Sequence, residues 1–185
     1  IQTGTSDRDT SGSVVIATGN TAGSGVAGSI SLEAGDATLA QGGNVVLQAG
    51  KSMTRTGGSI AISSGVGRAT SSGSLILETA NAGEEGQSGR VRIKTGTASE
   101  GSSGSVSLST GDSSEGAGGS ITLSVGTGES GSGGNVNILA GGSKQSAGGD
   151  VVVRSGGSNE AGSGSINIMS SNAGEEGASG DISMS

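Results

Sequence analysis

The chain has 185 residues, 41 of them Gly, and it contains no Pro, Cys, His or aromatic residue. Lack of Cys excludes disulfides and thiolate metal sites, and lack of His removes the commonest general base and metal ligand. The formal charge of -7 and the missing aromatic stacking groups argue against a nucleic-acid partner. No apolar run approaches the roughly 18 residues that a membrane span needs.

A repeat of fifteen residues runs along the whole chain, and each unit opens on a Gly that we number position 1. The spacing between these glycines is 15 residues, or 16 at three places. A short fixed period over a whole chain is typical of a solenoid. The opening glycines are Gly12, Gly28, Gly43, Gly58, Gly73, Gly89, Gly104, Gly119, Gly134, Gly149, Gly164 and Gly180.

Positions 3 and 5 of every unit are aliphatic, and position 7 is mostly a small residue. Their spacing of two predicts that they share one face of a strand, while positions 2, 4 and 6 form an opposite face that is mostly polar. We expect the aliphatic residues to form the structural core. Its central members are Val106, Leu108, Ile121, Leu123, Val136 and Ile138.

One strand per unit cannot bury an aliphatic face alone, so we expect the units to stack in parallel register about 4.8 Å apart. The sequence therefore predicts an all-β fold, a parallel β-solenoid (β-helix) of about 12 coils of 15–16 residues. Its core would be thin, with small residues of the return half beneath the aliphatic ladder, and its length about 58 Å. The alternative is that this ladder packs against a second chain or a neighbouring sheet.

Position 8 is Gly in most units, which suggests a corner that needs positive φ or close backbone approach. Two of the 16-residue units replace this Gly by Ala80 and Ser171. There we expect Asn81 and Asn172 to form the corner, because Asn tolerates left-handed conformations. The central corner glycines are Gly96, Gly111, Gly126 and Gly141.

Residues 1–185 are predicted to form a single repeat solenoid that is uncapped at both ends. The chain starts at position 5 of a unit, Ile1, and stops at position 6, Ser185. Solenoids normally cap their ends to avoid open sheet edges. We therefore expect a segment of a longer repeat or a filament subunit that stacks end to end.

Glu85, Glu100 and Glu115 occupy equivalent places in successive units, four residues before the next opening Gly. Stacking would place their carboxylates in a column about 5 Å apart, a weak candidate for a divalent-cation site. A solvated acidic edge, screened by water and salt, is the interpretation we prefer. We expect no cofactor and no catalytic residue.

Arg90, Arg92 and Lys94 occupy all three outward positions of one segment. Such a basic strip could bind an acidic glycan or sulfate. The simpler interpretation is a surface ion pair between Lys94 and Glu78, which holds the same position in the preceding unit, worth less than about 1 kcal/mol.

The segment Gly-Ser-Ile-Thr-Leu-Ser-Val-Gly at 119–126 and its relatives resemble the Gly/Ser/Thr-rich solenoid repeats of extracellular fibres and surface proteins, including those of algae and their viruses. The resemblance covers the whole chain, is compositional, and implies an architecture and a location. The 15-residue coil is also similar to that of β-helical insect antifreeze proteins. Their Thr ladders and disulfides are missing here, so their activity does not carry over.

The predicted function is that of a structural subunit of an extracellular filament, fibril or appendage shaft, at a cell or virion surface. Its partners would be copies of itself, end to end and also laterally, and O-linked glycans on its many Ser and Thr residues. No enzyme activity is expected. The alternative is a surface adhesin or an ice- or glycan-binding solenoid stalk, which saturable binding by a monomer would favour.

Overall fold

The computed structural model describes residues 1–7, 10–175 and 177–184. These residues contain neither a helix nor a strand, so there are no element bounds to give. The prediction of an all-β fold, a parallel β-solenoid or β-helix, is therefore wrong for the single chain. The described residues instead form a coil-type chain in which extended segments alternate with bends.

The chain divides into two compact units, Ile1–Ile93 and Lys94–Ser185. Bends recur in both units with the period of the sequence repeat, each in the half of the repeat that follows the aliphatic positions. In the first unit they lie at 22–25, 38–40, 53–55 and 68–70, followed by a turn at 84–85. In the second unit they lie at 99–101, 114–116, 129–131, 144–146 and 159–161.

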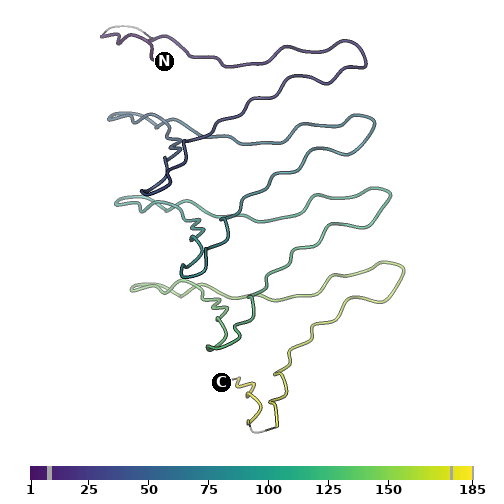
Figure 1. Cartoon of the computed structure of the whole chain (residues 1–185). Coiled ribbons are helices and arrows are strands. Elements are labelled where there is room, and N and C mark those ends of the chain that lie inside the picture. Colours follow the sequence, from purple (N-terminus) through teal and green to yellow (C-terminus); the bar gives the residue numbers. More distant parts are fainter. Residues whose placement is uncertain (8–9, 176, 185) are drawn as a thin grey trace. The chain divides into compact units, whose positions relative to one another are not determined.

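Within the first unit the chain changes direction at each bend, as Figure 1 shows. The extended segment 58–65 then runs in the same direction as the segment 12–19 (Figure 1). These two segments open on glycines three repeat units apart. One coil therefore takes three repeat units, and the expected coil of 15–16 residues is wrong.

Missing hydrogen bonds explain why the extended segments are not strands. Among residues 11–175 and 177–184, each hydrogen bond joins residues at most ten positions apart. A strand is defined by a ladder of backbone bonds to a neighbouring strand. Segments such as 12–19 and 58–65 follow the same direction without such a ladder between them, so period-two patterning yields extended backbone but no sheet.

The predicted aliphatic core does not form, because none of the described side chains is buried. Position 3 is 48–67% exposed and position 5 is 61–89% exposed from Ile16 to Met184, against 73–84% for the large aliphatic residues on the opposite face. Position 3 is therefore less exposed than the opposite face, position 5 overlaps that face in exposure, and neither face is covered. The residues expected in the core are exposed as follows: Val106 66%, Leu108 78%, Ile121 56%, Leu123 75%, Val136 51% and Ile138 71%.

Candidate functional site

A hydrogen bond between glycines closes the loop that joins one extended segment to the next. The amide of Gly43 donates to the carbonyl oxygen of Gly35 at 2.9 Å, which joins position 1 of one unit to position 8 of the unit before. The loop between them makes the bend. The same bond recurs at 2.9–3.0 Å from Gly58 to Gly50, Gly73 to Gly65, Gly149 to Gly141 and Gly164 to Gly156.

Close packing recurs at this loop closure, between the opening Gly and the position 7 residue before it. A Cβ added at Gly43 would lie 3.0 Å from the Cβ of Ala34, closer than ordinary contacts allow. Thr18 also donates its hydroxyl to the carbonyl oxygen of Gly28 at 2.9 Å. Position 7 is therefore small because it lies against the next opening Gly. Half-buried position 7 residues are Ala34, Ala49, Thr95 and Ser155.

The predicted role of the position 8 glycines is wrong in one respect. No described residue has positive φ, whether Gly or not, so neither these glycines nor Asn81 and Asn172 form a left-handed corner. The chain reverses over a loop of several residues, so no single residue needs a special conformation. A Cβ would meet nothing within 4 Å at any of the four central corner glycines, Gly96, Gly111, Gly126 and Gly141.

A serine at position 10 stabilises many of the bends. The hydroxyl of Ser143 accepts hydrogen bonds from the amides of Ser146 at 2.9 Å and Gln145 at 3.3 Å. Ser and Thr hydroxyls commonly stabilise turns through nearby amides in this way. The sequence pattern indicates only that position 10 is small. Ser just before a bend that contains little Gly is nevertheless a turn signal. Equivalent bonds are accepted by Ser52, Ser113 and Ser158.

The three candidate carboxylates lie at bends. Glu85 lies in the turn 84–85 of the first unit, and Glu100 and Glu115 lie in the bends 99–101 and 114–116 of the second unit, all of them exposed. Within the described part of the chain, no group of three or more Asp or Glu residues is gathered as a metal site would require. Glu85 belongs to the first compact unit, and Glu100 and Glu115 belong to the second. The column of the three carboxylates therefore stays a prediction.

The three residues of the basic strip are exposed, and each is unpaired within the compact unit to which it belongs. Arg90 and Arg92 have neither an ion pair nor a hydrogen bond inside the first unit, and the same holds for Glu78. Lys94 likewise has no ion-pair partner inside the second unit. The expected pair between Lys94 and Glu78 stays a prediction, since these residues belong to different units.

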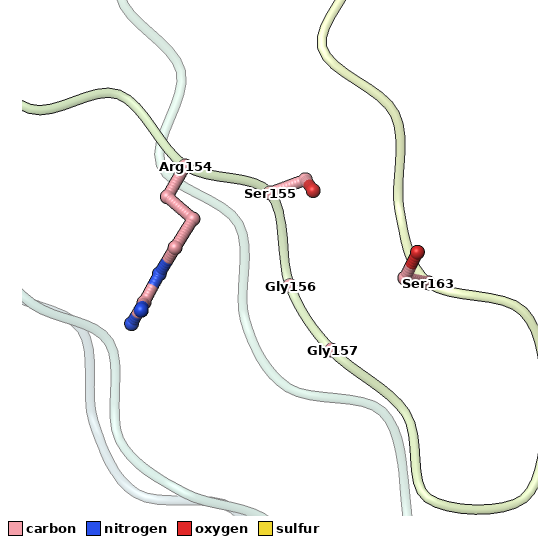
Figure 2. A pocket seen from close by; sticks show the side chains of 5 residues that line it. All are labelled: Arg154, Ser155, Gly156, Gly157 and Ser163. Carbon is pink, nitrogen blue, oxygen red and sulfur yellow. The ribbon is translucent and has the colours of Figure 1, made fainter.

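An open hollow of about 550 Å³ lies at the loop closed by Gly164 and Gly156. Figure 2 shows that the side chain of Arg154 extends away from Ser155 and Ser163, the other polar side chains around it. A catalytic pocket brings a few polar groups together on one point. This lining has no carboxylate and no convergent pair, so it offers no acid–base chemistry. The lining residues are Arg154, Ser155, Gly156, Gly157 and Ser163.

The feature that remains is the aliphatic face, which we define as positions 3 and 5 of all units. It recurs in every unit and is exposed throughout the described residues. No helix that could cross a membrane occurs in the described residues. Comparison of the chain with family models, with curated proteins and with solved structures gives no match.

Proposed function

We propose that this chain is a structural subunit of an extracellular filament or appendage shaft at a cell or virion surface, built by self-association and without catalytic activity. The observation that carries the proposal is the exposure of the aliphatic face, 48–89% at positions 3 and 5 from Val14 to Met184 and 110% at Ile1. Soluble monomers rarely expose contiguous apolar patches of more than a few hundred Å². An exposed aliphatic face that recurs in each repeat unit is typical of an interaction surface.

The total exposed area supports the same proposal. The chain has an accessible surface of 18857 Å². A compact monomer of 17.2 kDa would have about 7,800 Å² by the usual scaling with mass. The difference is several times the roughly 800 Å² that each partner contributes to a standard interface. Association of copies would cover this surface, and with no buried side chain among the described residues these have no other source of hydrophobic stabilisation.

Repetition of one unit suits a shaft. Each unit presents the same aliphatic positions, so contacts between copies can repeat along the length of the chain, both end to end and laterally. Exposed Ser and Thr hydroxyls on the polar face would remain accessible to O-linked glycans. Intact mass spectrometry of native material tests the glycans separately, because sugar additions appear as regular mass increments.

Electron microscopy and sedimentation of the whole chain test the proposed function. We expect elongated assemblies that lengthen with concentration. The double variant Val106→Asp with Leu108→Asp places charges on the aliphatic face and should dissolve them. The matched control, Ser107→Asp with Ser109→Asp, places the same charges on the polar face and should still assemble. A chain that stays monomeric at all concentrations and binds a glycan or ice saturably would overturn the proposal in favour of a binding stalk.

A further inference from the structure

We infer that the partner of this chain is two further copies of itself, wound alongside it in parallel, each displaced along the chain by one repeat unit. Extended segments of different copies would then lie next to one another and share backbone hydrogen bonds. This inference rests on the proposed self-association and specifies its geometry. The inferred contacts lie between chains, because the described residues of a single chain form no ladder of backbone hydrogen bonds between their extended segments.

Unpaired backbone amides and carbonyls in an extended segment favour a neighbouring chain as the partner. In the segment 104–111 no amide or carbonyl takes part in a hydrogen bond; the Thr110 hydroxyl alone bonds, to Gly119 at 3.3 Å. Backbone donors and acceptors that an apolar interface covers must be paired. An extended segment laid parallel to another offers those partners at a spacing of about 4.8 Å. Covering the aliphatic face thus calls for an occupant that also brings an extended backbone.

The period of the repeat selects a second copy as that occupant. Direction changes at every bend, so a partner must bend after the same fifteen or sixteen residues to stay alongside for more than one segment. It must also present an aliphatic residue at every position 3 and 5 to continue the face. Another copy of this chain meets both requirements in its repeat units, with a difference of one loop residue where a 16-residue unit lies beside a 15-residue unit.

The charged residues of the polar face favour a displacement of one repeat unit between neighbouring copies. Copies without displacement would place Arg90, Arg92 and Lys94 each beside the identical residue of the neighbour. Like charges directly opposite are destabilising. A displacement of one unit instead places Lys94 beside Glu78, and it puts no other two charged residues of positions 2, 4 and 6 side by side. The charged residues of these positions are Glu33, Glu78, Arg90, Arg92, Lys94, Asp150, Arg154 and Asp181.

The size of the coil decides the number of copies. One coil takes three repeat units, as the segments 12–19 and 58–65 show in Figure 1. Three chains, each displaced by one unit from the one before, therefore complete one coil and return to the first chain. Such a heterologous contact closes on itself instead of growing without limit. The segment of the first chain one coil further on then lies next to the third chain. It occupies the place of a fourth copy, so no fourth copy is needed.

Disulfide trapping tests this arrangement, because the chain has no Cys of its own. Ser107 and Thr122 both hold position 4, in successive units, and both are exposed. A displacement of one unit places Ser107 of one copy beside Thr122 of the next, at the Cα separation that a disulfide needs. The double variant Ser107→Cys with Thr122→Cys is assembled, oxidised and run on a denaturing gel without reductant. The single variants S107C and T122C are the matched controls.

The expected result is a covalent band that stops at three chains for the double variant and single chains for both controls. Dimers of S107C alone would show pairing without displacement and would overturn the inference. Covalent ladders beyond three chains, or a disulfide within one chain, would overturn it as well. Sedimentation of the same samples separates the two proposals: assemblies with the wrong disulfides refute this geometry alone, and monomers refute the proposed function too.

Discussion

Gly43 donates its amide proton to the carbonyl oxygen of Gly35 at 2.9 Å, and its Cα lies where a Cβ would meet the Cβ of Ala34 at 3.0 Å. This hydrogen bond and this close approach together explain the residue types at three positions of the repeat. Position 1 is Gly because of this close approach, position 7 is small for the same reason, and position 8 supplies the acceptor. In five of the 15-residue repeat units the repeat therefore closes a loop through a hydrogen bond between two glycines.

Replacing Gly43 by Ala should open this loop. The added Cβ would lie 3.0 Å from Ala34 and 3.3 Å from the backbone of Gly35, so the hydrogen bond must lengthen or break. A bond of this kind contributes about 1 kcal/mol, which corresponds to roughly fivefold. Amide hydrogen exchange at residue 43, followed by NMR, should therefore quicken by up to about fivefold. Gly35→Ala is the control, because nothing lies within 4 Å of its added Cβ. Equal exchange in both variants would contradict the explanation.

The contact between Gly134 and Val125 should show energetic coupling. A Cβ at Gly134 would lie 2.8 Å from Cγ1 of Val125, so Gly134→Ala should lower the thermal midpoint of the assembled protein. Val125→Ala removes the clashing methyl groups and should rescue the variant, with a coupling of about 0.5 kcal/mol or more for residues in contact. Gly126→Ala, with open space around its Cβ, should leave the midpoint unchanged. Strictly additive effects would show that the contact is unimportant.

Loss of the Ser143 hydroxyl should loosen the bend 144–146. Ser143→Ala removes the acceptor of two amides, those of Gln145 and Ser146. We expect steeper NMR temperature coefficients at both amides and no change in the neighbouring bend at 159–161, which Ser158 stabilises. Ser120→Ala, on the polar face of an extended segment, is the matched control and should affect neither amide. Unchanged coefficients in S143A would mean that the hydroxyl does not hold the bend.

Reversal of charge at Lys94 should weaken the assembly that we infer. Lys94→Glu would place two carboxylates side by side, and since exposed pairs contribute about 0.2–1 kcal/mol, association should weaken by up to about fivefold. The double variant Glu78→Lys with Lys94→Glu restores opposite charges and should recover the association. Sedimentation at low salt measures both. At about 1 M salt, where screening acts within about 3 Å, the three proteins should behave alike. A double variant as weak as K94E would exclude this pairing.

The local structure of this protein follows from its sequence. Gly at position 1, a small residue at position 7 and a two-residue aliphatic spacing are all visible in the letters, and the structure has recurrent bends or turns at the repeat period and a position 3 that is less exposed than the opposite face. The positive φ expected at Gly96, Gly111, Gly126 and Gly141 does not occur, because the reversal is spread over a whole loop. The serine that stabilises the bend stands at position 10, where the repeat pattern indicates only a small residue.

Only the tertiary structure decided the direction in which each repeat unit follows the one before it. Periodicity is a property of neighbours along the chain, and it is the same whether each unit stacks on the last or turns away from it. Within residues 1–93 the bends send successive extended segments along different courses, and three repeat units complete a coil (Figure 1). Val106 and Leu108 consequently remain exposed, because a strand pattern buries nothing until a second backbone lies beside it.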